Sequence, residues 1–237
     1  MTNSNQLTRV LSLMDATMIN VGGILGSGIF MVPATVALYT ASSSLFFMVW
    51  ILGGIISLFG ALSVAELGAA MPRAGGQYVY LNEAYGPVWG YLYGWSAVAV
   101  INTASIAAVG VAFAEYLRFF FPLSGLEIKS IAIISIIILT TINVVDVKSG
   151  ARFQNWFTFT KIASIAMIIL LGLFLDGGST QNLSPLFSDQ SLTSLVGPLG
   201  LAMVAVLWTF DGWIFITYVA GEVKNPGRNI PLSIIFC

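Results

Sequence analysis

The sequence predicts an all-helical membrane protein that crosses the bilayer several times. Of its 237 residues, 57% are hydrophobic and 8% are charged, whereas about a quarter of the residues of a soluble domain are charged. The segment between Asp15 and Glu66 holds no charged residue, and about 20 apolar residues are enough for one helix to span the hydrocarbon layer. That segment is long enough for two such helices. Lipid is therefore the expected solvent of this chain, and the bilayer its expected partner.

Turn signals and charges divide the apolar sequence into six helices and the beginning of a seventh. The Pro226-Gly227 pair is expected to end the sixth helix. Asn229 then suits the N-cap of a seventh helix that has Pro231 in its first turn. Because the sequence stops soon afterwards, we expect residues 1–237 to be the N-terminal part of one longer membrane domain. The expected helices cover about 14–37, 45–70, 88–120, 130–145, 154–175 and 195–221, and the seventh begins at 231.

The distribution of basic residues predicts a cytoplasmic N-terminus, because cytoplasmic loops of membrane proteins are enriched in lysine and arginine. With the N-terminus inside, the inside loops carry six basic residues and the outside loops carry two. We therefore expect a multi-pass protein of the cell membrane, plasma or inner. The inside residues are Arg9, Arg73, Lys148, Arg152, Lys224 and Arg228, and the outside residues are Arg118 and Lys129.

The composition also argues against several classes of protein. A net charge of −1 offers no basic surface, so no nucleic-acid partner is expected. The sequence has no histidine and a single cysteine, Cys237, which removes Ser-His-Asp and Cys-His nucleophiles, histidine-bearing metal sites and an internal disulfide. Paired carboxylates at a workable spacing are lacking too. We expect no enzyme activity, cofactor or metal, and the lack of a repeated pore-lining segment argues against an ion channel.

A run of glycines interrupts the first expected helix. Four glycines occur between Gly22 and Gly28, and each weakens a helix by about 1 kcal/mol relative to alanine. A break here would leave backbone groups unpaired, which is costly in lipid unless a cavity or a polar ligand satisfies them. The free amides of Ser27, Gly28 and Ile29 would suit a carboxylate. Alternatively, the same glycines form a face on which another helix packs closely.

A second interruption is expected in the sixth helix, within the segment from Trp208 to Trp213. An aspartate in the middle of a membrane helix costs about 2.5–3.5 kcal/mol on insertion scales and is by default a functional residue. Asp211 is such a residue, and Gly212 beside it allows a break. Interrupted helices at corresponding positions of two halves point to the binding site of a transporter. The alternative is a kink in which Asp211 has a structural partner.

Two polar residues in other helices are further candidates. Lys161 lies nine residues beyond Arg152, which is roughly 13 Å along the helix and too deep for easy snorkelling. We expect it to point into the bundle and donate to carbonyls of a broken helix, the alternative being an interfacial lysine without consequence. Asn102, in the middle of the third helix, could reach the pocket or form a hydrogen bond between helices.

Three segments resemble signatures of the amino acid–polyamine–organocation (APC) superfamily. Residues 26–30, Gly-Ser-Gly-Ile-Phe, are similar to the signature of its first helix. Residues 65–68, Ala-Glu-Leu-Gly, and 72–80, Pro-Arg-Ala-Gly-Gly-Gln-Tyr-Val-Tyr, resemble the segment after its second helix. Residues 221–226, Gly-Glu-Val-Lys-Asn-Pro, with 228–231, Arg-Asn-Ile-Pro, match the loop after its sixth helix. The three occur in order across nearly the whole chain, and the resemblance is strongest to bacterial members of the L-type amino acid transporter branch.

The resemblance implies the leucine-transporter fold, in which two inverted five-helix repeats are followed by two further helices, about twelve in all. This chain would then be truncated after helix 6 and the start of helix 7. Members of the superfamily bind the α-carboxylate of their substrate on amides of the first broken helix, and its α-amino group on carbonyls of both broken helices. The matching positions are Gly26, Ser27 and Gly28 for the carboxylate, and Ile24, Trp208, Thr209 and Asp211 for the amino group.

The same resemblance implies roles for three other positions. Trp208 stands where the family has an aromatic gate over the substrate, and Asn102 stands where some members have a polar residue in the side-chain pocket. Lys161 resembles the lysine whose ammonium takes the place of a sodium ion in sodium-independent members. Asp211 departs from the family pattern, because several relatives have glycine or an apolar residue at this position.

These matches imply transport of a small amino acid by alternating access, as sodium-independent exchange or as proton-coupled uptake. A carrier of polyamines or organic cations from the same superfamily is one alternative. Another is a truncated membrane fragment that transports nothing and only packs against partner helices. The sequence leaves open which amino acid is carried, and whether an accessory subunit or an oligomer is formed.

Overall fold

Six helical segments of the structure are long and apolar enough to cross a membrane. The computed structural model describes residues 7–145, 147–175 and 179–237. In each of the six segments only 6–22% of the most apolar window is buried inside the protein, so most of the apolar surface faces outward and requires lipid. The chain is therefore a multi-pass membrane protein. The segments are Leu13–Tyr39, Ser43–Ala70, Pro87–Leu117, Gly125–Val144, Gly150–Phe174 and Thr193–Phe210.

The regular elements of the described residues are helices, apart from one β-bridge between Leu11 and Val223. A π-helical segment, Ala97–Ile101, joins α5 (Pro87–Ser96) to α6 (Asn102–Leu117), and single 3-10 turns occur at Thr180–Leu183 and Ala220–Glu222. The α-helices are α1 (Leu13–Ile24), α2 (Gly28–Tyr39), α3 (Ser43–Ala70), α4 (Gln77–Tyr85), α5 (Pro87–Ser96), α6 (Asn102–Leu117), α7 (Gly125–Val145), α8 (Val147–Phe174), α9 (Leu192–Phe210), α10 (Phe215–Tyr218) and α11 (Pro226–Ile235).

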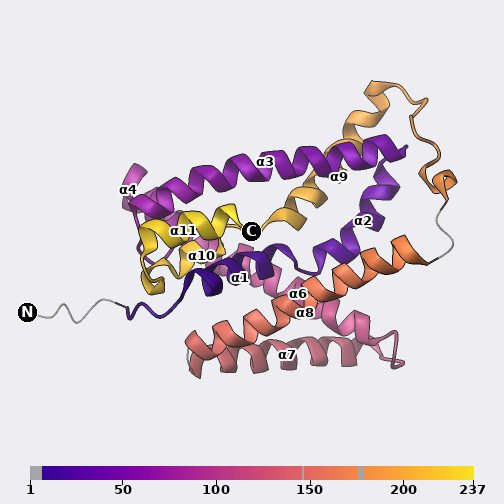
Figure 1. Ribbon diagram of the computed structural model, residues 1–237. Helices are drawn as coiled ribbons and strands as arrows, with labels where there is room; N and C mark the ends of the chain where they lie inside the picture. Colours follow the sequence, from indigo (N-terminus) through magenta and orange to yellow (C-terminus); the bar gives the residue numbers. More distant parts are fainter. Residues whose placement is uncertain (1–6, 146, 176–178) are drawn as a thin grey trace, which may run out of the picture.

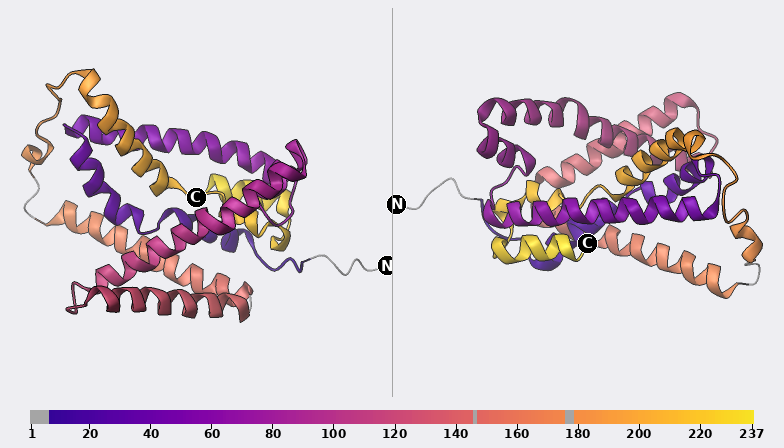
Figure 2. Two further views of the ribbon diagram at one scale, coloured as in Figure 1. Left: turned by 180° about the vertical axis from the view of Figure 1, so that it is seen from behind. Right: turned by 90° about the horizontal axis from the view of Figure 1, so that it is seen from above.

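The first spanning segment, made of α1 and α2, runs through the middle of the molecule (Figure 1). Helices α3 and α9 lie on one side of it and α7 and α8 on the other; α1 contacts α8, and α2 contacts α9. The short helices α10 and α11 lie at the end where the chain begins, and α11 contacts both α1 and α3. Figure 2 shows α5 and α6 as one diagonal rod across the back of the bundle.

Two clusters of buried apolar side chains hold the two halves of the first spanning segment. One cluster surrounds α1, and the other surrounds α2 and α9. Helix α3 contributes to both, through Ala61 and Ala65 to the first and through Val49 to the second. The unbroken α3 is therefore a common support for both halves of the broken segment.

The fourth span begins earlier than the sequence predicts, at Gly125 rather than near residue 130. The Ser124 amide donates to the Glu127 carboxylate at 2.7 Å, and the Glu127 amide donates to the Ser124 hydroxyl at 3.4 Å. This reciprocal pair is a capping box, which satisfies amides at the start of a helix. A glutamate in the first turn also complements the positive end of the helix. Residues 125–129 are therefore part of the helix, including Lys129, which the charge pattern placed in an outside loop.

The seventh helix also begins earlier, at Pro226 rather than near Pro231. Pro226 occupies the first helical position, where its missing N–H is not needed, and Asn225 adopts the left-handed conformation with a φ of 46°. The Asn229 side chain, which the sequence suggested as the N-cap, donates instead to the Lys224 carbonyl at 2.6 Å. The proline therefore starts a helix here in addition to separating it from the preceding one.

Candidate functional site

The first spanning segment is interrupted between α1 and α2. The Leu25 amide still donates to the Val21 carbonyl, but the Gly26 amide turns back to the Ile24 carbonyl at 2.8 Å. This short bond departs from the helical pattern, and a new helix starts at Gly28. The amide of Gly26, which the resemblance assigns to a substrate carboxylate, already has an acceptor within the protein.

Three amides are left open at the start of α2. Among the described residues, the N–H groups of Ser27, Gly28 and Ile29 donate to no protein acceptor. The amides of Phe30 and Met31 both donate to the Ser27 carbonyl at 3.2 Å. The N-terminal end of a helix carries about half a positive charge, and open amides there attract anions. The start of α2 therefore has the chemistry of an anion-binding site.

The last span is interrupted after Phe210, where α9 ends, so it is not one helix over 195–221. The Phe210 ring packs edge-on against Trp50 of α3, with ring centroids 5.8 Å apart. Asp211 is exposed, and its carboxylate accepts from the Gly212 amide at 3.0 Å. In the part of the chain that the structure describes, no three acidic, histidine or cysteine side chains gather in a way that could hold a metal ion. Asp211 is thus an isolated carboxylate at the second break.

The two breaks touch each other through glycines. A Cβ added to Gly212 would lie 2.5 Å from the carbonyl carbon of Gly23 and from the amide nitrogen of Ile24. Gly212 also has a φ of +133°, which residues with side chains avoid. The two backbones can approach so closely because neither glycine has a side chain. The sequence indicated these glycines as helix breakers, but not that they form the contact between the breaks.

Thr209 forms the contact between α9 and the start of α2. Gly28 is buried, and an added Cβ would lie 3.1 Å from Thr209 Oγ1 and 3.3 Å from Thr209 Cα. The Thr209 side chain is itself buried, and its hydroxyl donates to the Ala205 carbonyl at 3.0 Å. Gly28 therefore has two roles in this geometry, an open amide and a close packing position.

Lys161 of α8 lies against the end of α1. Its ammonium donates to the Gly22 carbonyl at 3.1 Å. A Cβ on Gly22 would overlap the side chains of Gln154 and Thr158, so the glycine allows α8 to approach α1 closely. Lys161 thus donates to a carbonyl of the first broken helix, as its position in the sequence predicts. The function of Lys161 in coupling stays a prediction.

Two further side chains of α8 continue this polar contact along α1. Thr158 donates its hydroxyl to the Met18 carbonyl at 3.4 Å, and Asn155 donates to the Asp15 carboxylate at 2.8 Å. With Lys161 they are spaced three residues apart, and such residues share one face of a helix. Sequence reasoning missed Asn155 and Thr158, although this spacing of polar residues in an apolar helix was the available signal.

The glycine-rich segment after α3 docks on α10. The amides of Gly75 and Gly76 donate to the carbonyls of Tyr218 and Thr217, each at 3.1 Å. Both glycines have positive φ values, 123° and 52°, and a Cβ on Gly76 would lie 2.7 Å from Thr217 Oγ1. The motif at 72–80 is therefore needed for contact with the segment that follows the second break.

The residues before α1 pair with the segment after α10. The Glu222 carbonyl accepts from the amides of Val10 and Leu11, both at 2.9 Å, and the Lys224 amide donates to the Leu11 carbonyl at 2.8 Å. Together with the bridge between Leu11 and Val223, these bonds tie the two segments at this end of the molecule. Burial also raises the pKa of the Glu222 carboxyl, because removal from water disfavours its charged form.

Among the described residues, two that were predicted for the site form no hydrogen bond with the open amides. Trp208 is 46% exposed, and its main-chain carbonyl accepts from the Asp211 amide at 3.2 Å. Asn102 is the first residue of α6 and is exposed. Their roles in covering the substrate and contacting its side chain stay predictions.

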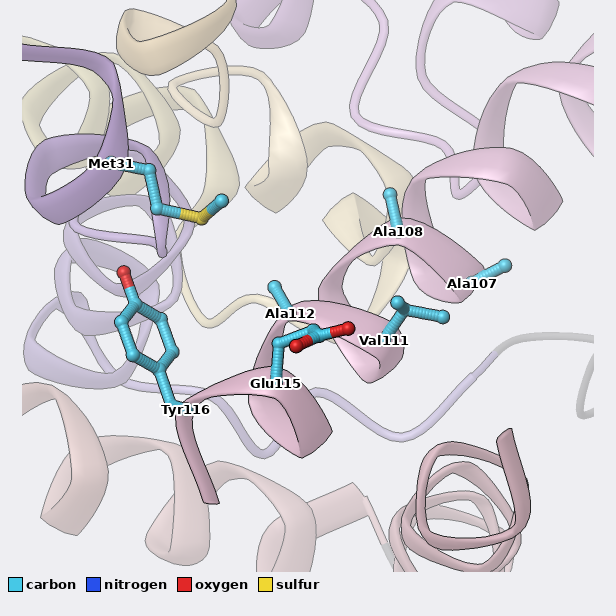
Figure 3. Close-up of a pocket in the computed structure, with 7 residues that line it drawn as sticks. All are labelled: Met31, Ala107, Ala108, Val111, Ala112, Glu115 and Tyr116. Atoms are coloured by element: carbon cyan, nitrogen blue, oxygen red, sulfur yellow. The ribbon is translucent and has the colours of Figure 1, made fainter. Parts of the chain in front are cut away.

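A cavity of about 660 Å³ lies between α2 and α6. Figure 3 shows Met31 on the α2 side and the Tyr116 ring pointing from α6 toward α2. The walls are mainly apolar, and Asn102 is not among the lining residues. The lining consists of Met31, Ala107, Ala108, Val111, Ala112, Glu115 and Tyr116.

Two spans that are broken at glycines, and whose breaks touch inside the helix bundle, are typical of transporter folds with discontinuous helices. The sequence model of the family described as "Amino acid permease" matches residues 11–237. The chain therefore belongs to the amino acid permease family, which confirms the resemblance seen in its motifs.

Several curated proteins are similar to this chain. The serine/threonine exchanger SteT of Bacillus subtilis (strain 168) is 37% identical over 232 residues, which are 97% of this chain and 51% of SteT. The b(0,+)-type amino acid transporter 1 of Homo sapiens is 37% identical over 237 residues, 98% of this chain and 48% of the relative. The cystine/glutamate transporter of Homo sapiens is 36% identical over 236 residues, which are 97% of this chain and 46% of the relative. The chain spans about half the length of the curated relatives it matches.

Proposed function

We propose that the protein carries amino acids across the cell membrane by alternating access, with its N-terminus in the cytoplasm. The observation that carries this proposal is the group of open amides at the start of α2, those of Ser27, Gly28 and Ile29. Every amino acid presents a carboxylate, and a helix N-terminus with open amides attracts one. The names of the similar proteins, an exchanger and two amino acid transporters, support the same class of substrate.

The α-amino group of the substrate is proposed to meet carbonyls at the ends of α1 and α9. Helix C-terminal ends carry a partial negative charge, and these two ends lie beside the contact between Gly23 and Gly212. The Trp208 ring would cover the bound substrate, and Asn102 would contact its side chain. The carbonyls concerned are those of Ile24, Trp208, Thr209 and Asp211, with Gly26 in the turn between them and the carboxylate site.

Transport is proposed to be independent of sodium, as exchange or as proton-coupled uptake. The Lys161 ammonium already donates to the Gly22 carbonyl at 3.1 Å. A sodium ion at the same carbonyl would be repelled by this positive charge. The name of SteT, an exchanger, favours exchange over proton coupling.

The test is uptake of a panel of labelled amino acids by the protein at its full natural length in liposomes, with sodium or choline in the buffer. Exchange is expected to give uptake only into liposomes loaded with unlabelled substrate. Proton coupling is expected to give uptake into empty liposomes under an inward proton gradient. Equal rates in sodium and choline are expected in both cases. Absence of uptake for every amino acid would refute the proposal.

A polyamine or organic cation carrier is the second candidate, favoured by the exposed carboxylate of Asp211 at the second break. The same liposomes tested with a labelled diamine separate the two candidates. If the labelled diamine is taken up, and unlabelled diamines but not amino acids inhibit that uptake, the polyamine carrier replaces the first proposal. A parallel test of residues 1–237 alone shows whether this portion transports anything or only packs against other helices.

Replacing Lys161 by alanine is expected to lower the exchange rate about tenfold or more while the protein still folds, because a hydrogen bond from a charged group contributes about 1.5–3 kcal/mol. The measurement is initial exchange rate per folded protein, with folding checked by gel filtration. Thr160→Ala is the matched control, since the Thr160 hydroxyl donates only to the Trp156 carbonyl of its own helix. Loss of folded protein in proportion to lost exchange would instead indicate a structural role for Lys161.

A further inference from the structure

Asn20 of α1 makes a buried bond to the segment that follows the second break. Its side-chain oxygen Oδ1 accepts from the Ile216 amide at 2.9 Å. Both residues are 0% exposed, so water cannot replace either partner. The bond joins positions 196 residues apart in the chain, and it links one half of each broken span.

The bond satisfies an amide that α10 cannot satisfy itself. The first amides of any helix lack acceptors within the helix, and α10 is only four residues long. The Phe215 amide donates to the Gly212 carbonyl at 3.1 Å, and the Thr217 amide donates to the Ile214 carbonyl at 2.9 Å. The Ile216 amide between them is held by Asn20. Asn20 therefore caps α10 from another helix.

Asn20 also lies between two backbone contacts that join the same segments. On one side is the bridge between Leu11 and Val223, and on the other is the approach of Gly23 to Gly212. Backbone contacts at both ends limit how α1 can separate from α10, and the Asn20 side chain fills the interval between them. The three contacts follow α1 from its beginning to the first break.

An asparagine is a costly choice for a site that needs only packing. The side-chain nitrogen Nδ2 of Asn20 is buried and has no hydrogen-bond partner among the described residues. A buried polar group without a partner destabilises the folded state, and an apolar side chain of the same branched shape would avoid that penalty. The bond to Ile216 is the compensating contact that the structure contains.

We propose that Asn20 is a positioning residue that fixes α10 on α1, so that the two breaks keep their mutual alignment while the protein changes between its inward-open and outward-open states. Asn20 acts through the Ile216 amide and does not touch the substrate. This inference rests on the proposed transport function for its consequence, but its structural part, the capping of α10, can be measured without transport.

The experiment compares three variants of the full-length protein in lipid nanodiscs and liposomes. Asn20→Leu removes the acceptor and keeps the branched shape of the side chain, and Asn20→Asp keeps an oxygen at the same place. Thr17→Val is the control, because the Thr17 hydroxyl donates to Leu13 of its own helix and to no other helix. The readouts are amide hydrogen exchange of residues 214–218 and the separate kcat and KM of amino acid exchange.

Asn20→Leu is expected to speed hydrogen exchange of the Ile216 amide about tenfold or more, because the lost hydrogen bond no longer opposes local opening of α10. The same variant should lower kcat about tenfold with KM within about twofold, the pattern of a residue that affects the conformational step. Asn20→Asp should restore protection and kcat toward wild type, and Thr17→Val should leave both unchanged.

If Asn20→Leu folds, two results would overturn the inference. One is an Ile216 amide that exchanges equally fast in the wild type and in Asn20→Leu. The other is an Asn20→Asp variant that behaves like Asn20→Leu, since aspartate keeps the acceptor oxygen and the shape, and the acceptor would then not be what protects the Ile216 amide. If Asn20→Leu does not fold, slow exchange of Ile216 in Asn20→Asp and in the wild type supports the inference, and fast exchange in either refutes it. If protection behaves as expected but no amino acid is transported, the proposed function fails and the capping stands.

Discussion

Replacing Gly28 by valine is expected to abolish substrate binding. A Cβ at this position would lie 3.1 Å from Thr209 Oγ1 and 3.3 Å from Thr209 Cα, and valine adds two methyl groups beyond it. The start of α2 must then move away from α9, which displaces the open amides of Ser27 and Ile29 from the second break. A hydrogen bond to a charged group contributes about 1.5–3 kcal/mol, so the loss of two such bonds lowers affinity by about 100-fold or more.

The measurement is equilibrium binding of the amino acid that the uptake panel identifies, on purified full-length protein. Gly200→Val is the matched control, because Gly200 also lies in a spanning helix and an added Cβ there meets no atom within 4 Å. The control should bind as the wild type does. A Gly28→Val protein that is folded and binds with unchanged affinity would show that the carboxylate site does not lie on these amides.

The second large effect is expected from Gly212→Ala, which should destabilise the whole protein. The alanine Cβ would lie 2.5 Å from two backbone atoms of α1, in Gly23 and Ile24, and backbone atoms cannot swing aside as a long side chain can. Backbone strain at the φ of +133° adds about 1–3 kcal/mol, and overpacking adds about 1–3 kcal/mol. Together these terms correspond to a fall in Tm of roughly 5–20 °C, measured by thermal unfolding in detergent.

Gly86→Ala separates the two causes of this effect. Gly86 also has a positive φ, 93°, but an added Cβ there meets no atom within 4 Å. It therefore suffers the strain without the clash, and its Tm should fall by clearly less than that of Gly212→Ala. Equal falls in the two variants would mean that the contact between the breaks contributes nothing, and would remove the main support for a joint site.

The membrane spans and the positions of the two breaks were predictable because their signals are local. A hydrocarbon layer excludes charges over a whole helix length, so the apolar stretches and their borders are visible in the composition. Clustered glycines weaken a helix, which indicated a break near Gly26, and an aspartate beside a glycine, Asp211 and Gly212, indicated the second break. The predicted ends were wrong where a side chain extended a helix, as Glu127 did by forming a capping box with Ser124.

The partners across the bundle were not predictable in the same way. In the sequence, Asn20 is one polar residue in an apolar helix, and nothing near it indicates that Ile216 is its partner. Asn155 and Thr158 show a regular spacing, but the spacing does not say which helix they face. Contacts of this kind depend on how the helices are arranged in three dimensions, and a single sequence holds no direct record of that arrangement.

Composition and motifs alone therefore predicted a multi-pass helical protein of the amino acid permease family with an interruption in each of two spans. They could do so because lipid solvation and backbone propensity act on consecutive residues. Only the tertiary structure shows that the Gly26 amide already donates to a protein carbonyl, while the amides of Ser27, Gly28 and Ile29 are open. The tertiary structure also shows that the two breaks approach each other at Gly23 and Gly212. These features depend on hydrogen-bond geometry and on close approach between distant segments, which form only when the helices pack.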